Sequence, residues 1–463
     1  MHRMCIGIAL MAALACAAGA GDYAVRSVAD LATVWAGHPV GFAFAEHGGA
    51  LWVGFYDHER FMVIGRRALD AKEWTLHRTK ERVGWDSHNY IAFGFDRDGQ
   101  LHVAANMHCV RLRYYRTETA GDPTSLKPVH RMTGQDERRC TYPRFLHTAD
   151  GRLLFMYRDG GSGNGRRLIN VYDEETRTWR RYVDQPLLSG GGRMNAYPTP
   201  ILRDRAGLFH MAWVWRDTPD CSTNHHLSYA RSRDLKAWEA SDGRRLALPL
   251  TIGNSEVVDP VPPRGGLLNS LVRLSFDAQD RPLIAYTRYD GKGCNQLWVA
   301  RLEEGGWKRY QTTAWDHRWE FKGGGAIGAK IRFSGLVPYG HGERLLQSVS
   351  HPTAGSGHRL LDAETLQPVA ETPRLPRWPR EVRARDGKLP GLGVRTRSLG
   401  HDGVLYVLRW ETLGANRDRP RPKDQTPPPS RLRLFELIEA DRNGTPDTRN
   451  PEPRTTAPEG KRP

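Results

Sequence analysis

Two histidines are placed where a β-hairpin would bring them together. The hairpin predicted over residues 90–107 turns near Asp98, and His88 and His108 each lie ten residues from that turn. Because antiparallel strands set such positions opposite each other, the two imidazoles should face one another at the open end of the hairpin. Imidazole takes up or releases a proton near neutral pH and also binds metal ions. The pair is therefore predicted to transfer protons, to hold a metal or to play a structural part.

The next two hairpins carry reactive side chains at similar distances from their turns. Tyr142 and Arg158 each lie eight residues from the centre of one turn. Tyr197 lies nine residues before the centre of the following turn, and Trp215 and Arg216 lie nine and ten residues after it. Taken singly, the tyrosine at 142 would be a packed aromatic and the arginine at 158 half of a surface ion pair. If the hairpins are arranged radially, their open ends converge and predict one site lined by His88, His108, Tyr142, Arg158 and Tyr197.

These residue types suit the removal of a proton from a carbon next to a carboxylate. A cation such as Arg158 would neutralise the carboxylate, so that negative charge can spread onto it. Tyr142 or a histidine could take the proton, and a tyrosine or histidine could protonate the departing oxygen. Uronic acids present such a proton at C5 and a glycosidic leaving group at C4. The set therefore predicts β-elimination at a uronate, which needs neither water nor a redox cofactor.

A hairpin of two apolar strands around an Asp- or Gly-containing turn recurs along the chain. Seven copies can be counted, at residues 40–56, 90–107, 144–158, 201–215, 272–289, 331–349 and 396–410. The spacing of about fifty residues suits four-stranded sheets set around an axis. The fold class predicted is therefore all-β, a seven-bladed β-propeller, with a pair of β-sandwiches as the alternative. Residues 431–438 alternate like a strand and are expected to close the ring against residues 40–44.

The two ends of the chain differ from the part between them. Residues 1–20 combine a basic start, an apolar run and the small residues Ala18-Gly19-Ala20, which predicts a signal peptide. Lipoprotein processing at Cys16 is the weaker alternative, so the protein is expected to be secreted or periplasmic. Residues 21–440 are predicted to form the propeller, and the polar, Pro-rich residues 441–463 a disordered tail. A net charge of +16 favours an anionic partner. Export argues against nucleic acid and for an acidic glycan, and no membrane span is expected.

Several stretches in chain order resemble the BNR-4 repeat proteins, which include ulvan lyases and related seven-bladed polysaccharide lyases. The matching stretches are residues 87–89, 98–108, 132–134, 141–145, 155–165, 195–198, 213–216, 223–225 and 323–325. What the resemblance implies is a lyase canyon on one face of the propeller. Elimination would then be carried by His88, His108, Tyr142 and Arg158, and substrate would be bound by Asn89, Tyr197, Arg216 and His225. Which of Tyr142 and the histidine pair is the base is left open.

The remaining expectations concern cofactors, partners and rival functions. The chemistry requires no cofactor, although related propellers can carry a structural calcium or zinc whose ligands the sequence does not name. Four cysteines, Cys109, Cys140, Cys221 and Cys294, lie outside the signal segment and allow three full pairings. His226, next to His225 on a predicted strand, should point to the opposite face. The expected substrate is an anionic, ulvan-like polysaccharide, and the protein is expected to be a monomer. A sialidase-like glycoside hydrolase and a non-catalytic glycan-binding propeller are the two rivals.

Overall fold

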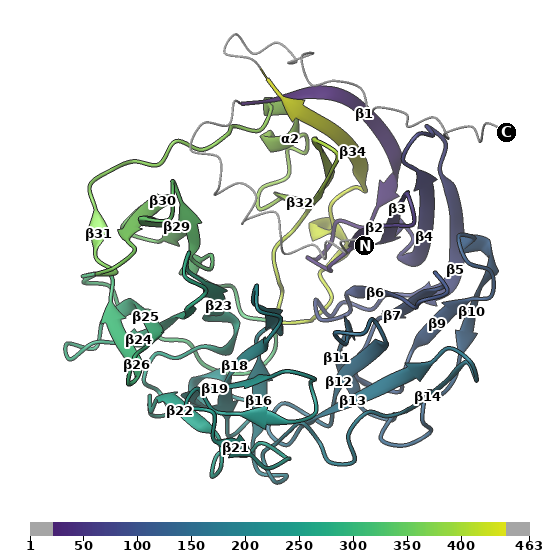
Figure 1. Ribbon diagram of the computed structural model, residues 1–463. Helices are drawn as coiled ribbons and strands as arrows, with labels where there is room; N and C mark the ends of the chain where they lie inside the picture. The colour runs from purple at the N-terminus through teal and green to yellow at the C-terminus, as the bar shows by residue number, and fades with distance from the viewer. Residues whose placement is uncertain (1–21, 441–463) are drawn as a thin grey trace, which may run out of the picture.

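The computed structural model describes residues 22–440, whose β-sheets are arranged in a ring (Figure 1). The ring confirms the all-β propeller arrangement and argues against a pair of sandwiches. The expected signal peptide and tail lie outside the described residues. Within the described part, no helix combines the length and the apolar character that crossing a membrane requires.

The strands form seven sheets, and each predicted hairpin contributes to a different one. The first sheet contains β2 (Ala43–His47), β3 (Ala50–Tyr56), β4 (Phe61–Ala68) and β5 (Thr75–Arg82). The second contains β6 (Ile91–Phe95), β7 (Leu101–Ala105), β9 (Tyr114–Thr117) and β10 (Leu126–Val129). The third contains β8 (His108–Val110), β11 (Cys140–His147), β12 (Leu153–Asp159), β13 (Arg166–Asp173), β14 (Thr178–Arg181) and β15 (Leu188–Ser189).

The other four sheets of the described chain complete the ring. The fourth contains β16 (Asn195–Pro198), β17 (Leu202–Arg203), β18 (Phe209–Arg216), β19 (Asn224–Ser232), β20 (Trp238–Glu239), β21 (Arg245–Leu246) and β22 (Glu256–Asp259). The fifth contains β23 (Val272–Phe276), β24 (Pro282–Tyr289), β25 (Asn295–Glu303) and β26 (Gly306–Gln311). The sixth contains β27 (Arg332–Phe333), β28 (Val337–Tyr339), β29 (Arg344–His351), β30 (Gly355–Asp362) and β31 (Pro368–Val369). The last contains β32 (Gly393–His401), β33 (Val404–Thr412), β34 (Ser430–Glu439) and β1 (Tyr23–Val34), and the short helices are α2 (Arg380–Arg383) and the 3₁₀ turns Pro123–Ser125, Cys221–Thr223, Asn269–Leu271 and Lys423–Gln425.

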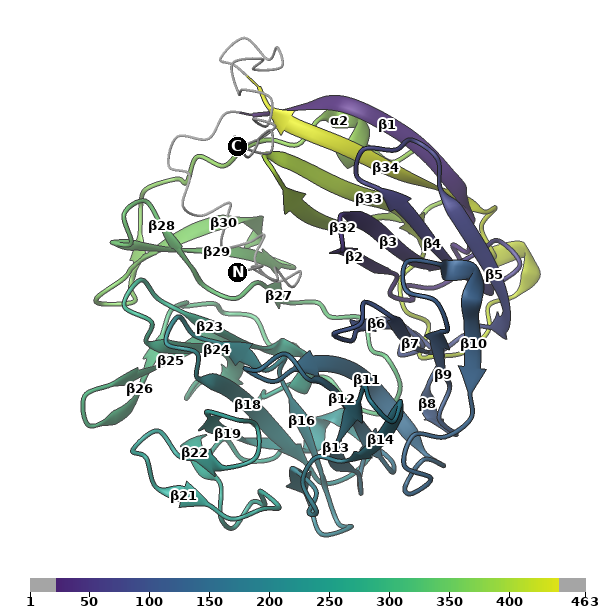
Figure 2. The ribbon, with the colours of Figure 1, turned by 45° about the vertical axis from the view of Figure 1, so that its right-hand side comes forward.

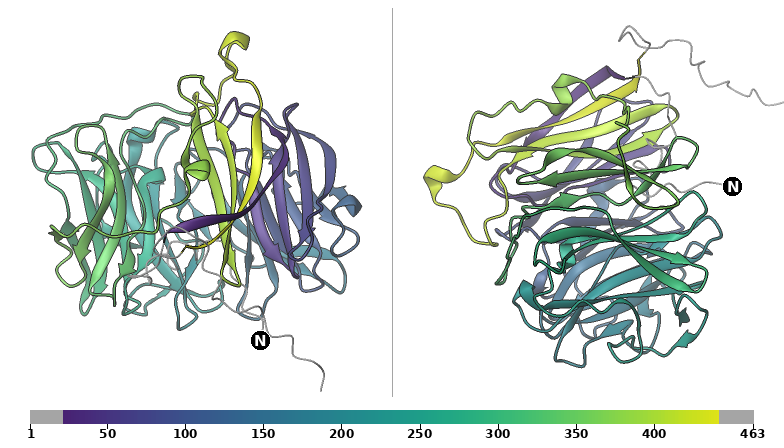
Figure 3. Two further views of the ribbon diagram at one scale, coloured as in Figure 1. Left: turned by 90° about the horizontal axis from the view of Figure 1, so that it is seen from above. Right: turned by 90° about the vertical axis from the view of Figure 1, so that its left-hand side faces the viewer.

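Both ends of the described chain meet in the last sheet, but not through the strands that we expected. Strand β34 pairs with β1 over ten residue pairs, from Tyr23–Glu439 to Val34–Ser430, and its other neighbour is β33. Residues 40–44, the expected partner, instead enter the first sheet, where β2 pairs with β3. The long β1 offers about twice as many backbone pairs as the five-residue β2, and it covers an edge that would otherwise stay unpaired. Figures 2 and 3 show β1 running along the outside of β34.

The repeated sequence pattern produces repeated packing. In the second sheet, buried His102 bonds the turn residue Asp96 at 3.0 Å and Tyr114 at 2.7 Å. In the fourth sheet, His210 bonds the turn residue Asp204 at 3.0 Å and a tyrosine of the next strand at 2.6 Å. These histidines stiffen the sheets, because every polar atom of the buried ring has a partner. They lie apart from the predicted site.

Residues 232–238 resemble a degenerate Asp-box, a turn motif that usually carries a glycine, and they keep the geometry of a tight turn. The carboxylate of Asp234 accepts hydrogen bonds from the backbone N–H groups of Lys236 and Ala237, at 2.8 and 2.9 Å. Leu235, at φ 63°, adopts the left-handed conformation for which glycine is usual. The missing glycine therefore strains this turn without opening it.

Candidate active site

His88 and His108 meet as predicted, with their ring centroids 4.3 Å apart. His88 lies in the segment between β5 and β6, and His108 begins β8. Although β8 follows the second hairpin in the chain, it pairs with β11 of the third sheet, where His108 lies opposite Thr141. This exchange of a strand between neighbouring sheets brings the histidine pair to the edge that carries Tyr142.

Asp86 joins the two histidines, and the sequence reasoning did not assign it this part. One carboxylate oxygen accepts a hydrogen bond from Nδ1 of His88 at 2.6 Å, and the other accepts one from Nδ1 of His108. Burial raises the pKa of Asp86, but the hydrogen bonds from His108 and His88 outweigh it and hold this pKa well below its usual range. Asp86 is therefore a carboxylate that orients both rings. With the proton on Nδ1, the lone pair of each neutral ring lies on Nε2, where it can accept a proton.

A residue from the far end of the chain holds this segment in place. Oδ1 of Asp418 accepts hydrogen bonds from the hydroxyl of Ser87 at 2.9 Å and from its N–H at 3.2 Å, and Oδ2 accepts one from the N–H of Ala326 at 2.8 Å. The carboxylate also lies 3.7 Å from Nδ1 of His88. Arg417 and Asp418 both have positive φ, 50° and 61°, which marks a strained turn. This part of the basic, Pro-rich loop between β33 and β34 therefore reaches the site.

Tyr142 is turned toward the histidines by a β-bulge. In the β11–β12 ladder, Thr141 pairs with Arg158 and Arg144 with Met156, so one extra residue is inserted on β11. The expected cross-strand pairing of Tyr142 with Arg158 is therefore off by one residue. Tyr142 adopts φ 57°, which is rare for an aromatic residue. Its ring lies 5.5 Å from that of His88.

Arg158 reaches the site, but from beneath Tyr142. Its side chain is fully buried, and Cζ lies 4.9 Å from the centroid of the Tyr142 ring. The guanidinium donates only to neutral groups: the hydroxyl of Thr141 at 3.1 Å, the carbonyl of Gly160 at 3.1 Å and Sγ of Cys109 at 3.2 Å. Among the described residues it forms no ion pair, so a surface salt bridge does not explain it. Its charge acts on the site across the Tyr142 ring, and a ligand carboxylate could contact it only if that ring moved.

Tyr197 extends the site into the fourth sheet. Its ring lies 6.2 Å from that of Tyr142, and its hydroxyl donates to the carbonyl of Ser162 at 3.3 Å. Residues 162–164 form the turn that we expected there, with no helix after it. In the ladder Tyr197 pairs with Val214, one residue from the expected partner, while Cζ of Arg216 lies 5.5 Å from its ring centroid. The rings of His88, Tyr142 and Tyr197 thus form a row that runs from the segment between β5 and β6, through the third sheet, to the fourth sheet.

All four predicted substrate-binding residues, Asn89, Tyr197, Arg216 and His225, are buried. Asn89 is buried, and its carbonyl accepts a hydrogen bond from the hydroxyl of Tyr56 at 2.7 Å. Nε2 of His225 bonds Asp217 at 2.9 Å, and its Nδ1 lies 2.7 Å from Nδ1 of His226. The expectation that His225 and His226 point to opposite faces was wrong. A bulge at His226, with φ 46°, breaks the alternation of the strand.

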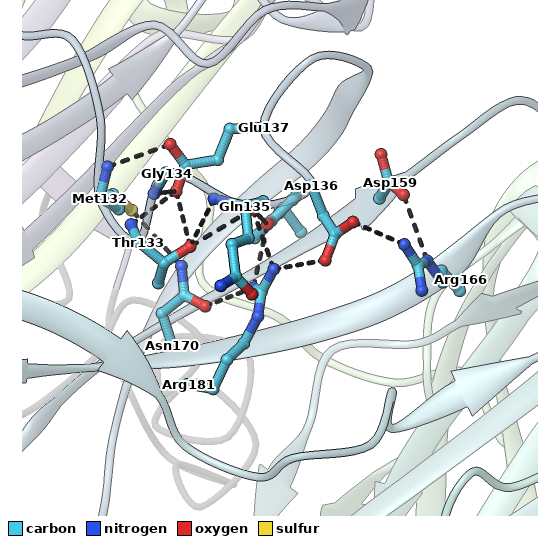
Figure 4. A network of polar contacts seen from close by, with 11 residues as sticks. Met132, Thr133, Gly134, Gln135, Asp136, Glu137, Asp159, Arg166, Asn170 and Arg181 are labelled. Atoms are coloured by element: carbon cyan, nitrogen blue, oxygen red, sulfur yellow. Dashed lines mark hydrogen bonds and ion pairs between the residues drawn. The ribbon is translucent and has the colours of Figure 1, made fainter.

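A network at the edge of the third sheet supports the end of β12 (Figure 4). The Glu137 carboxylate accepts hydrogen bonds from the backbone N–H groups of residues 132–134. Arg166 donates to Asp136 at 2.7 Å and to Asp159, the last residue of β12, at 3.2 Å. This part of the family-like sequence is therefore scaffolding, and its arginines are paired with carboxylates.

The four cysteines of the described chain form no disulfide, and three side chains of the site could hold a metal ion. Cys109, Cys140, Cys221 and Cys294 are all free thiols, so none of the possible pairings is formed. One ligand atom from each of Asp86, His88 and His108 lies within 4.8 Å of the other two. Two imidazoles and one carboxylate suit zinc and not calcium, which prefers an all-oxygen shell.

The comparison with protein families decides the membership of the chain. The sequence profile of a family described as "BNR repeat-containing family member" matches residues 50–315. The chain belongs to this family. The match confirms the resemblance inferred from the sequence stretches.

Solved structures of polysaccharide lyases share the fold of this chain at low sequence identity. The polysaccharide lyase Uly1 is 15% identical, with a TM-score of 0.59 over 90% of this chain and 100% of that one. A PL25 ulvan lyase is 12% identical, with a TM-score of 0.58 over 89% and 95% of the two chains. A further structure of the PL25 enzyme is described as bound to -[GlcA(1-4)Rha3S]-.

Characterised relatives match over a short segment only. Ulvan lyase, long isoform, from Glaciecola sp. (strain KUL10) is 52% identical over 45 residues, which are 10% of this chain and 4% of that protein. The same enzyme from Pseudoalteromonas sp. (strain PLSV) is 50% identical over 45 residues, again 4% of its length. The match therefore spans a small part of these much longer proteins.

Proposed function

We propose that this protein is a polysaccharide lyase that cleaves a uronate-containing polymer by β-elimination. The observation that carries the proposal is the meeting of His88, His108 and Tyr142 in one place, with the charge of Arg158 directly beneath. Three of these groups come from the third sheet and the fourth, His88, comes from the segment between β5 and β6. The strained backbone of Tyr142 supports a functional reading, because such strain persists mainly where function needs the conformation.

The geometry supports a two-part proton transfer. Tyr142 or Nε2 of a histidine takes the C5 proton of the uronate, and the C–H electrons form the C4–C5 double bond. The C4–O bond breaks, and its electrons leave with the glycosidic oxygen, which a second group of the set protonates. The positive charge of Arg158 stabilises the negative charge that spreads onto the carboxylate. Asp86 fixes the direction of both imidazoles throughout.

The proposed substrate is a sulfated, ulvan-like polysaccharide. The support comes from the polysaccharide lyases among the structural relatives, two of which are ulvan lyase structures, and from the glucuronate–rhamnose sulfate oligosaccharide bound in one of these. The formal charge of +16 adds long-range attraction for a polyanion. We also propose that each of the seven sheets is one blade, that the protein acts as a secreted or periplasmic monomer, and that Asn89 and His225 shape the site from behind.

The hydrolase rival lacks a suitable acid among the described residues of the site. A glycoside hydrolase of the usual kind needs one carboxyl that is protonated and one that is ionised. Asp86 is kept ionised by two histidines, and Asp159 binds Arg166. Neither carboxylate is placed to donate a proton, which favours elimination.

The proposed elimination uses no metal, although Asp86, His88 and His108 could hold zinc. Zinc bound there would supply a Lewis acid for a carboxylate. It would also engage ring nitrogens of the imidazoles, which the proposed mechanism needs for proton transfer. The two roles of the histidines are therefore in competition.

One absorbance assay separates the three functions. Purified protein is mixed with ulvan and with other uronate polymers, and ultraviolet absorbance and reducing ends are followed together. A lyase produces both, because the new double bond is conjugated with the carboxylate. Reducing ends without the absorbance would establish hydrolysis, and binding without either signal would establish a carbohydrate-binding module.

A further inference from the structure

The fully or nearly fully buried arginines of the described chain divide into two groups by their partners. Three of them bind carboxylates: Arg67 binds Glu436, Arg301 binds Glu303 and Arg409 binds Glu411, at 2.7, 2.7 and 2.6 Å. The other three, Arg158, Arg167 and Arg216, form no ion pair with any described residue. All three of these lie over the rings of Tyr142 or Tyr197. Among these six arginines, the three without a carboxylate partner therefore all lie at the candidate site.

Arg167 is the member of this group that neither the sequence nor the comparisons pointed to. It lies directly opposite Arg158 in the β12–β13 ladder, and its side chain is as close to Tyr142, with Cζ 5.1 Å from the ring centroid. Its neighbour Arg166 points the other way and is held by carboxylates. The side chain of Arg167 makes no hydrogen bond to the described residues, and its Nε is buried without a partner. Nη1 of Arg158 is likewise buried and unpartnered.

This arrangement is costly for the protein by itself. Like charges directly opposite on neighbouring strands repel, and a buried cation without a counter-charge loses its hydration. Burial, together with the nearby charges of Arg158 and Arg144, lowers the pKa of Arg167 to about 9, so it is still positive at neutral pH. Such a pair is explained if a negative charge comes to lie next to it.

We propose that Arg167 is a second charge-stabilising residue of the site, and that it works with Arg158 to hold a negatively charged oxygen beside Tyr142. The oxygen belongs either to an acidic group of the substrate or to Tyr142 itself during proton transfer. Arg167 acts on this oxygen through the Tyr142 ring, so it is a positioning residue and not a catalytic one. The inference rests on the proposed lyase function for its kinetic test, but not for its stability test.

The stability test compares Arg167→Met with Arg301→Met. Methionine fills a similar volume without charge, so Arg167→Met should raise the melting temperature by relieving the repulsion from Arg158. Arg301→Met should lower it, because Glu303 loses its buried partner. A fall in melting temperature for both variants would show that Arg167 is a structural residue and would overturn the inference. Arg167→Lys, which keeps the charge, serves if the methionine variant does not fold.

The kinetic test separates the two sources of the negative oxygen. Arg167→Met should lower kcat/KM about a hundredfold, and Arg167→Lys should restore most of it. A rise in KM would place the charge on the bound substrate, whereas a fall in kcat at constant KM would place it on Tyr142 in the transition state. Values of kcat and KM within about twofold of the wild-type enzyme would overturn the inference.

A third measurement keeps the inference testable if no polymer is cleaved. Glucuronate and sulfate are titrated separately into the wild-type protein and into Arg167→Met, and the melting temperatures are recorded. A larger stabilisation of the wild-type protein by either anion supports the cation pair, and the more effective anion identifies the group. Equal shifts in the two proteins, together with a lower melting temperature of Arg167→Met, would reject it.

Discussion

The third sheet and the last sheet treat buried arginine in opposite ways. In the last sheet, Arg409 donates to Glu411 at 2.6 Å and to Asp386 at 3.0 Å, so its charge is matched. In the third sheet, Arg158 donates to a hydroxyl, a carbonyl and a thiol, and Arg167 donates to nothing described. Arg409 and Arg158 are equally buried. Burial alone therefore does not tell a stabilising arginine from a functional one, whereas the presence of a carboxylate does.

The difference has a physical basis. A buried ion pair that is complete contributes to a single packed state, and losing one partner leaves the other unpaired. A buried cation without a counter-charge lowers the stability of the protein until an anion binds next to it. The free energy gained when the anion binds can then stabilise the transition state. Substitutions in the third sheet should therefore change activity, and substitutions in the last sheet should change stability.

The largest effect is expected for Tyr142→Phe. Removing the hydroxyl takes away a proton-transferring group, so elimination should fall by about a thousandfold or more while the melting temperature stays near that of the wild-type protein. Initial rates of absorbance increase measure this directly. Tyr197→Phe is the matched control and should lose less than about tenfold, because its hydroxyl is already engaged by Ser162. Equal losses in the two variants would remove the special position of Tyr142.

The opposite result, a loss of stability without a loss of specific activity, is expected for Arg409→Met. This change leaves Glu411 without its buried partner and should cost about 3 kcal/mol in the free energy of unfolding. The specific activity of the remaining folded protein should be that of the wild-type enzyme, since Arg409 lies in another sheet. Denaturant unfolding and initial rates on the same sample measure the two quantities. A variant that loses activity and keeps its stability would break the comparison between the two sheets.

The sequence predicted the contrast only in part. The hairpins and the meeting of His88 with His108 followed from alternating apolar residues and regular turns, which are local signals. The bulge that turns Tyr142 has no such signal, because its positive φ occurs at a residue that rarely adopts it. Asp86 could have been noticed from its place two residues before His88. The contact of Asp418 with Ser87 spans 331 positions along the chain, and no spacing rule reveals it.

The arginines show the same limit. Arg166 and Arg167 are adjacent and identical in type, and strand alternation says only that they point to opposite sides. Which side holds carboxylates depends on Asp136 and Asp159, and these are placed by the tertiary fold. Whether a charge is paired is therefore a property of the assembled sheets.

Zinc binding tests whether the two histidines of the site must be free of metal for elimination. Its preferred ligands are present in Asp86, His88 and His108, so micromolar zinc should inhibit elimination several-fold and a chelator should restore it. The variant His108→Ala, assayed for zinc binding by calorimetry, should bind zinc more weakly. Activity that needs zinc and is lost on chelation would contradict the metal-free mechanism.

The smallest effect is expected for Asp418, which supports the site without belonging to either sheet of the comparison. Asp418→Asn keeps the size of the side chain, but its amide group cannot accept hydrogen bonds at both ends as the carboxylate does from Ser87 and Ala326. The segment that carries His88 should loosen, which lowers kcat about threefold with little change in the melting temperature.

The control for this change lies in the same loop. Asp424 is exposed, and Asp424→Asn removes the same charge from the protein without touching the site. If the loop acts only through its long-range charge, the two variants should change activity equally and respond alike to added salt. If Asp418 acts by holding the His88 segment, only its own variant should lose activity, and salt should not restore it. The second result would show that the position of His88 beside Tyr142 is set by a residue from the opposite end of the chain.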